Sequence, residues 1–300
     1  MIAAMVAAAL GKPQREGKGW RSHCPIHGGQ SLVITDGRDG RLLVRCWGGG
    51  CDPRAILAEL RRLGLLDGVA GDRAAEVEAF SNERDRDDVT RRIAIARRIW
   101  DAAQNVRGTP VEQYLRTRGI KIPVPYMLRW TPSLRRPDGS VAPAMVARID
   151  GIDGELIGVS RTWLDRDAAG IWRRCARAML GRAASGAVRL APAAETLLVG
   201  EGIENCLSAT QATAHAVWAA LSTSGLRALI LPPTVRQVII LADHDVSGAG
   251  ERAARMAAAR WLAEGRRVRI AMPPEPGSDF NDVLVGRAYA QVMEACDVAA

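Results

Sequence analysis

Two acidic residues follow directly after the most hydrophobic strand-like segment of the chain, in the stretch VIILADHDVSGAG. Asp243 and Asp245 are separated by a single residue, His244. Because side chains alternate along an extended strand, the two carboxylates face one side and the histidine faces the other. Gly248 and Gly250 then let the backbone turn close beneath the acids. We interpret the two acids as a pair and expect His244 to point away from it.

Two further acids, Glu201 and Asp279, also come after strand-like segments. In parallel α/β sheets, functional groups gather where the strands end. Carboxylates forced together repel one another, which is tolerable when they share cations. Oxygen ligands with no nearby cluster of cysteine or histidine residues favour Mg²⁺ or Mn²⁺, ions that can hold the attacking and leaving oxygens of a phosphate. The alternative is that each acid caps a helix or solubilises a loop.

The elements that must position these acids alternate strictly between strand and helix after Pro192. The expected strands are TLLVG, HAVWAAL, QVIILAD and RVRIAM, and each is followed by a helical segment. Such alternation is typical of a parallel sheet with helices on its faces. We therefore expect an α/β domain over residues 193–300, built on a four-stranded, mostly parallel sheet with flanking helices.

A different set of ligands lies near the N-terminus. Cys24 and His27 are separated by two residues, and Cys46 and Cys51 by four, including three glycines. Two strand-like runs about a GRDG turn predict a hairpin that brings the two pairs together. Three thiolates and one imidazole in a tetrahedron favour Zn²⁺ in a closed, structural site. The alternative is four incidental or buried residues.

The acidic motifs over residues 193–285 resemble the Toprim domain. The resemblance rests on Glu201-Gly202, the Asp243-x-Asp245 pair followed by SGAG, and the segment GSDFND. It implies that Glu201 is the general acid/base and that Asp243 and Asp245 bind Mg²⁺. It also implies that further acids, matched here by Asp279 and less directly by Asp282, complete the metal cluster.

A zinc module, a basic segment and a Toprim domain in this order are similar to bacterial, phage and plasmid DNA primases. The resemblance implies synthesis of short RNA primers from nucleoside triphosphates on single-stranded DNA, with catalytic Mg²⁺ or Mn²⁺ and a zinc module that grips the template. One position departs from the pattern, because bacterial primases usually carry aspartate four residues after the glutamate and this chain has Asn205. An amide can coordinate or orient a ligand, but it removes one negative charge and puts the number and affinity of the metal ions in question.

Positive charge is concentrated in the middle of the chain. Residues 91–195 carry 19 basic and 9 acidic side chains, whereas the formal net charge of the whole chain is +8. Arginines alternate with tryptophans there, a composition suited to phosphate pairing and base stacking on single strands. We take Arg161, Arg173 and Arg174 as a candidate nucleic-acid contact, against the alternative of solvated surface charges.

These patterns predict four parts. They are a zinc-ribbon module at 1–68, an acidic linker or poorly packed helix at 69–90, a basic α+β subdomain at 91–192 and the Toprim domain at 193–300. Helices are expected over MIAAMVAAAL, after Asp52 as N-cap, and after Thr109 as N-cap. Strands are expected between Val141 and Leu164.

Two other functions fit the same motifs. A Toprim nuclease would use the acids to activate water, and a non-catalytic zinc and Toprim DNA-binding factor would not need them. A topoisomerase is disfavoured, because only Tyr114, Tyr126 and Tyr289 are present.

The sequence also bounds partners and location. It has no P-loop motif, so a helicase partner is expected on a separate polypeptide. No apolar run is long enough to span a membrane, and cysteine usage without a signal peptide favours the cytoplasm.

Overall fold

The computed structural model describes residues 2–37, 42–47, 51–66, 74–245 and 248–286, with side chains of the helix that begins at residue 74 described from residue 87. The chain divides into two compact units, Met1–Arg84 and Asp85–Ala300, and each is considered by itself. The four-part division expected from the sequence stays a prediction at its finer boundaries. None of the helices in these described ranges has the length and apolar character needed to cross a membrane.

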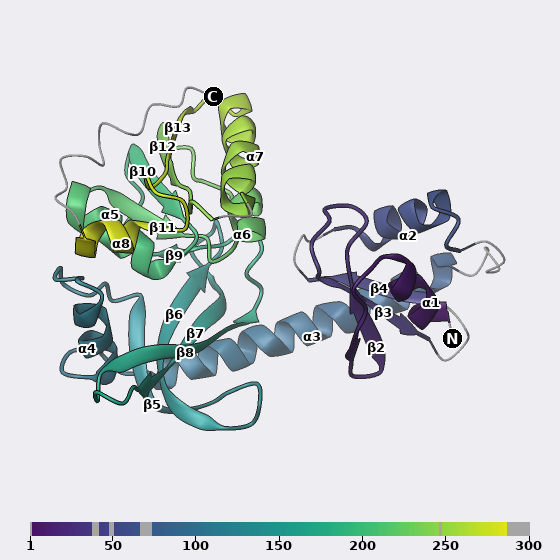
Figure 1. Ribbon diagram of the computed structural model, residues 1–300, viewed down its shortest axis with the longest axis horizontal. Helices are drawn as coiled ribbons and strands as arrows, with labels where there is room; N and C mark the ends of the chain where they lie inside the picture. The colour runs from purple at the N-terminus through teal and green to yellow at the C-terminus, as the bar shows by residue number, and fades with distance from the viewer. Residues whose placement is uncertain (1, 38–41, 48–50, 67–73, 246–247, 287–300) are drawn as a thin grey trace. The chain divides into compact units, whose positions relative to one another are not determined.

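The first unit is a four-stranded antiparallel sheet with two helices (Figure 1). Its elements are α1 (Ile2–Ala9), β1 (Gln14–Glu16), β2 (Gly19–Ser22), β3 (Leu32–Asp36), β4 (Leu42–Cys46) and α2 (Pro53–Arg62). Val6, Ile34 and Leu60 are fully buried in its core. The expected first helix, hairpin and capped helix are confirmed, since the Asp52 side chain accepts a hydrogen bond from the Arg54 N–H at 3.0 Å.

The second unit begins with two helices and an antiparallel sheet, in which the strands lie in the order of the chain. The boundary between the units falls within α3 (Ala74–Ala102), and the other elements are α4 (Pro110–Thr117), β5 (Leu128–Arg135), β6 (Val141–Asp150), β7 (Leu156–Arg166) and β8 (Trp172–Gly181). The segment 69–90 is therefore helical from Ala74 onward, and residues 69–73 lie outside the described residues. Thr109 occupies the cap of α4, but its hydroxyl donates to the Val106 carbonyl instead of accepting from the helix.

A second sheet follows, and its four parallel strands are those expected from the sequence. They are β10 (Thr196–Gly200), β11 (Ala216–Ala219), β12 (Gln237–Leu241) and β13 (Arg267–Ala271). The expectation of four strands is incomplete, because β9 (Val188–Arg189) adds a fifth, antiparallel strand beside β11. The strand order is β13-β12-β10-β11-β9.

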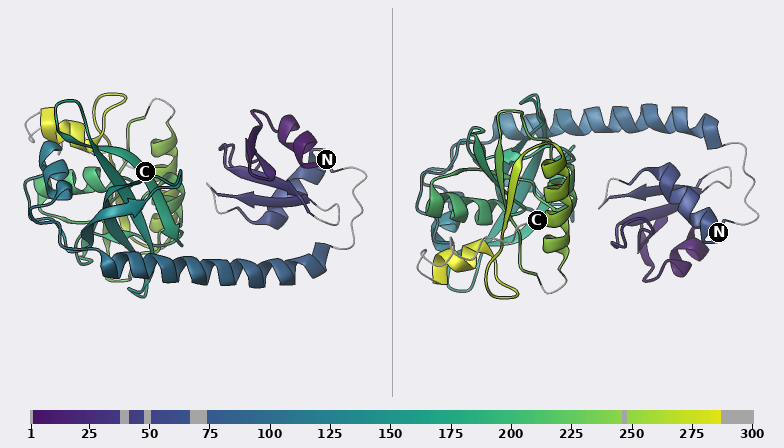
Figure 2. Two further views of the ribbon diagram at one scale, coloured as in Figure 1. Left: turned by 90° about the horizontal axis from the view of Figure 1, so that it is seen from below. Right: turned by 90° about the horizontal axis from the view of Figure 1, so that it is seen from above.

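Helices cover both faces of this second sheet, as strand–helix alternation requires. They are α5 (Ile203–Thr213), α6 (Thr223–Ala228), α7 (Ala249–Ala263) and α8 (Phe280–Gly286). Figures 1 and 2 show α7 on one side of the sheet and α5 with α8 on the other. Trp261 of α7 packs with Val199 and Ile240, whereas Phe280 of α8 packs with Leu198 from the opposite face.

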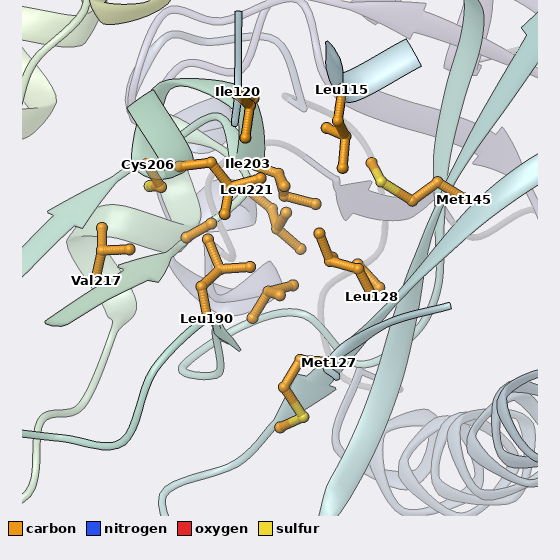
Figure 3. Packing of buried hydrophobic residues seen from close by; sticks show 14 of the residues in the cluster. Leu115, Ile120, Met127, Leu128, Met145, Leu190, Ile203, Cys206, Val217 and Leu221 are labelled. Carbon is orange, nitrogen blue, oxygen red and sulfur yellow. The ribbon is translucent and has the colours of Figure 1, made fainter. Parts of the chain in front are cut away.

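The two sheets of the second unit share one hydrophobic core. Leu128 and Met145 come from the antiparallel sheet, and Ile203 and Val217 come from the parallel sheet and its helix. Figure 3 shows these side chains pointing into the same space, together with Leu115 of α4. The other face of the antiparallel sheet is covered by α3, where Trp100 packs with Val146 and Val159. We call the face of the antiparallel sheet that lines the shared core the inner face, and the face covered by α3 the α3 face.

Ser22 provides a test of the first unit. Its fully buried hydroxyl lies 2.8 Å from the Ala7 carbonyl and 2.9 Å from the Gly11 carbonyl, next to the end of α1. We expect Ser22→Ala to lower the free energy of unfolding by about 1–2 kcal/mol, because it leaves buried carbonyl groups without a donor. Scanning calorimetry measures the loss, and the exposed Ser140→Ala is the control. A loss of unfolding free energy no larger than that of the control would contradict a stabilising role for the Ser22 hydroxyl.

Candidate active site and metal centre

The four zinc-ligand candidates come together in the first unit. One ligand atom from each of Cys24, His27, Cys46 and Cys51 lies within 4.8 Å of all the others. The His27 Nε2 atom is 3.0 Å from the Cys46 sulfur, and the Cys24 and Cys51 sulfurs are 3.8 Å apart. The pairing of β3 with β4 accounts for this, because it places Leu32 opposite Cys46 and brings the two ligand pairs to one end of the hairpin.

The chemistry of this quartet fits a cation. Burial raises the pKa of Cys51 to about 12, and the charges of Cys24 and Cys46 add to the rise. Burial also raises the pKa of Cys24. Thiols in such surroundings become thiolates only when a positive charge compensates them, and three thiolates with one imidazole suit a tetrahedral Zn²⁺. The expected zinc-binding group is therefore confirmed in its geometry.

We expect the full chain to carry about one Zn²⁺, and Cys46→Ser to lose it together with the fold of the first unit, because structural zinc contributes directly to folding. Elemental analysis and thermal unfolding measure the two effects. Cys175→Ser is the matched control, since Cys175 lies on β8 in the other unit. Freshly purified, chelator-free protein without zinc would refute the assignment.

The acids meet at the carboxyl edge of the parallel sheet. Glu201 follows β10 directly, and Asp243 follows β12, its neighbour in the sheet. Burial raises the pKa of Glu201 to about 7, and the charges of Asp243 and Asp245 add to the rise. Burial also raises the pKa of Asp243, with Asp279 and Asp245 acting in the same direction. A carboxyl group that titrates near neutrality can take and give protons, as general acid/base chemistry requires.

Each member of the Asp243–Asp245 pair is held by a different donor. The Asn205 Nδ2 atom donates to Asp243 Oδ1 at 2.8 Å. The Asp245 carboxylate accepts from the N–H groups of Ala249 and Gly250, at 3.1 and 2.7 Å, so it caps the start of α7. A helix N-terminus favours negative charge at this place. The pair is therefore fixed by one amide and one helix end.

Gly250 is required where α7 approaches the acids. A Cβ atom on this residue would lie 2.7 Å from the Asp243 carbonyl oxygen and 3.1 Å from Asp245 Oδ2. Gly248 has a φ of +65°, in the left-handed region that glycine adopts readily. The close turn expected at these two glycines is therefore present.

Asp279 and Asp282 form the start of α8. The Asp279 carboxylate accepts from the N–H groups of Asn281 and Asp282, both at 2.9 Å, and the Asp282 carboxylate accepts from the Asp279 N–H at 3.0 Å. Burial raises the pKa of Asp279, and Arg118, 3.8 Å away, opposes the rise. Asp279 contributes to the field at Asp243, whereas Asp282 is exposed and engaged in the reciprocal cap.

The acid cluster is more open than the zinc-binding quartet. Within the described part of the chain, only the quartet brings three or more possible ligands to within 4.8 Å of one another. Oxygen-ligand sites for Mg²⁺ commonly keep several waters and use few carboxylates, so this donor set still fits such an ion. His244 stands apart from the cluster, because its Nδ1 atom contacts the Pro273 carbonyl at 2.8 Å.

The three candidate arginines do not lie on one face of the antiparallel sheet. Arg161 lies on the α3 face, where it is half-buried and contacts Trp163, a fully buried ring that no base can reach. Arg173 pairs with the Asp167 carboxylate at 2.9 Å. Only Arg174 belongs to the inner face, where it lies 3.9 Å from Glu204. The postulated group of three therefore separates into two faces of one sheet.

Arg177 is a basic residue beside Glu201 and Asp243 that the sequence did not single out. Its guanidinium donates to the Leu221 carbonyl at 3.4 Å and lowers the pKa of both Glu201 and Asp243, against the larger effect of burial. Strand alternation alone places Arg174 and Arg177 on opposite faces. A bulge at Cys175 shifts the β8 register, so that both arginines face inward.

Two family models match the chain. Residues 196–289 match the Toprim domain family, and residues 90–190 match a domain of unknown function, DUF7146. The parallel sheet with its acidic edge is thus a Toprim domain, and the resemblance drawn from the acidic motifs is confirmed. No curated protein matches the chain significantly.

Solved primase structures resemble the chain at low sequence identity. The Aquifex aeolicus primase, with its zinc-binding and RNA polymerase domains, is 16% identical with a TM-score of 0.46, over 98% of this chain and 82% of that one. A DnaG primase catalytic domain bound to single-stranded DNA is 17% identical with a TM-score of 0.47, over 71% and 83%. The primase fragment of the bacteriophage T7 primase-helicase protein is 17% identical with a TM-score of 0.40, over 61% and 69%.

Proposed function

We propose that this protein is a DNA primase that synthesises short RNA primers on single-stranded DNA by metal-dependent nucleotidyl transfer. The observation that carries the proposal is the set of acids at the Toprim sheet edge, Glu201, Asp243 and Asp245, together with Arg177 of β8 in the antiparallel sheet. Acids for a divalent cation beside a fixed guanidinium suit a triphosphate substrate.

The residues divide the chemistry among them. Asp243 and Asp245 would hold the cation, with Asp279 completing the site. Bound Mg²⁺ or Mn²⁺ supplies positive charge to the transferring phosphate. Glu201, with a pKa near 7, accepts the proton of the attacking 3′-hydroxyl, whose oxygen bonds to the α-phosphorus of the triphosphate as the bond to pyrophosphate breaks. Arg177 pairs with a phosphate oxygen of the incoming nucleotide and so orients it for in-line attack.

The zinc module would bind the template strand. Arg21, Val33 and Arg45 pair across β2, β3 and β4 on the side of the sheet opposite its core. The Arg45 guanidinium lies 4.0 Å from the centre of the Trp47 ring, which is 47% exposed. An exposed aromatic ring beside an arginine can stack a base and pair with its phosphate. A replicative helicase is a further proposed partner, since these 300 residues contain no P-loop motif of their own.

The acids provide the decisive test. We expect Asp243→Asn, Asp245→Asn and Glu201→Gln each to reduce primer synthesis at least about a hundredfold, because each removes charge at the point of phosphoryl transfer while keeping the side-chain shape. Asparagine at 245 retains an acceptor for the N-terminus of α7. His244→Ala should cost less than about tenfold, because the ring contacts Pro273 instead.

The assay combines single-stranded DNA, labelled nucleoside triphosphates and Mg²⁺ or Mn²⁺. A parallel incubation without triphosphates separates the competing functions. Divalent-dependent DNA cleavage that is lost in the same variants would assign the cluster to a nuclease. DNA binding with neither synthesis nor cleavage would assign the chain to the non-catalytic class.

Arg177 gives an independent test of nucleotide binding. We expect Arg177→Ala to raise the KM for nucleoside triphosphate about tenfold or more, the usual cost of losing a charge-assisted hydrogen bond. The matched control is Arg173→Ala, three register positions away on the α3 face. Equal KM changes in both variants would show that the effect is one of general positive charge.

A further inference from the structure

Glu204 is a buried acid for which the proposed chemistry has no use. It lies in the first turn of α5, between Glu201 and Asn205, and is 6% exposed. Burial of a carboxylate beside other carboxylates is costly unless donors or cations compensate it. The hydrogen-bond and ion-pair partners of Glu204 therefore indicate the role of this buried carboxylate.

The partners of Glu204 come from outside the Toprim domain. The Tyr114 hydroxyl donates to Glu204 Oε1 at 2.7 Å, and Arg174 lies 3.9 Å from the same oxygen. Tyr114 belongs to α4 and is 4% exposed. This hydrogen bond joins two residues that are 90 positions apart in the chain. It also shows that Tyr114 is a buried donor and not an accessible nucleophile.

The residue after Glu204 holds the acid cluster. Asn205 is 5% exposed, and its Nδ2 atom donates to Asp243 Oδ1 at 2.8 Å. An ionised aspartate can only accept hydrogen bonds, so the amide nitrogen must face it. Asn205 thus fixes one oxygen of Asp243, and its own orientation depends on the first turn of α5.

The remainder of α5 is anchored elsewhere. The Gln211 side chain donates to the Gly119 carbonyl at 3.0 Å and accepts from the Ile122 N–H at 3.1 Å. Asn281 of α8 donates to Ser208 at 2.8 Å. Removal of the Tyr114 hydroxyl would therefore leave the helix docked while it frees the first turn.

We propose that Tyr114 and Glu204 are positioning residues that act through Asn205. Their hydrogen bond fixes the first turn of α5, this turn holds Asn205 against Asp243, and the segment before the Toprim domain thereby sets the affinity of the acid cluster for divalent cations. The cation part rests on the proposed function, whereas the hydrogen-bond relay does not.

The relay can be tested without metal or substrate. The chain has four asparagines, so the side-chain amide signal of Asn205 can be assigned in ¹⁵N spectra of the full chain by its loss in Asn205→Ala. We expect Tyr114→Phe to speed hydrogen exchange at this amide about three- to tenfold, a typical coupling between linked sites. Tyr126→Phe is the matched control, because Tyr126 is 77% exposed. An unchanged hydrogen-exchange rate at the Asn205 side-chain amide in Tyr114→Phe would overturn the relay.

Mn²⁺ binding to the zinc-loaded chain, measured by electron paramagnetic resonance, tests the cation part. We expect Tyr114→Phe to weaken Mn²⁺ binding about three- to tenfold, and to have no further effect in an Asn205→Ala background, since residues that act in series are not additive. Additive losses in the double variant would overturn action through Asn205. Absence of Asp243-dependent Mn²⁺ binding in the unsubstituted chain would count against the proposed function and the cation part, while the amide exchange would still decide the relay.

Discussion

Carboxylates gathered at the edge of one parallel sheet repel one another, and the second unit is organised around that repulsion. Three of the acids are held by side-chain or backbone N–H donors. An asparagine amide holds Asp243, a helix end holds Asp245, and the backbone of α8 holds Asp279. These donors carry no net charge, and among the three acids Asp279 also has Arg118 3.8 Å away. The cluster therefore keeps a negative field that cations can enter, with Arg177 as a fixed positive charge beside it.

The sheet topology explains why such a cluster can form. Parallel strands end at one edge, so residues that follow β10 and β12 become neighbours although about 40 positions separate them in the chain. Helices α7 and α8 start at acids of this cluster and direct their N-terminal N–H groups toward them. The same acids that could bind cations thus also begin helices. The two interpretations of these acids, as metal ligands and as helix caps, are compatible.

Local patterns predicted much of this structure. Alternation of strands and helices after Pro192 gave the four parallel strands, and ligand spacing gave the zinc-binding quartet. Short-range periodicity cannot reveal the two-residue strand β9 or the bulge at Cys175, because both depend on pairing with distant strands. The bulge decides which arginines face the acids, so the choice of Arg161 and Arg173 followed from composition alone. Tyr114 was equally hidden, because its partner lies 90 residues away.

The core shared by the two sheets also bears on how this protein could be divided or recombined. The family models meet between residues 190 and 196, yet Leu128 and Met145 on one side of that junction are buried with Leu198 and Ile203 on the other. Excision of either part would expose apolar surface that water now does not reach, and apolar exposure of this kind promotes aggregation. The two segments matched by the family models therefore need not unfold as separate cooperative units. Transplantation of the acidic sheet edge into another protein would require both sheets to move together.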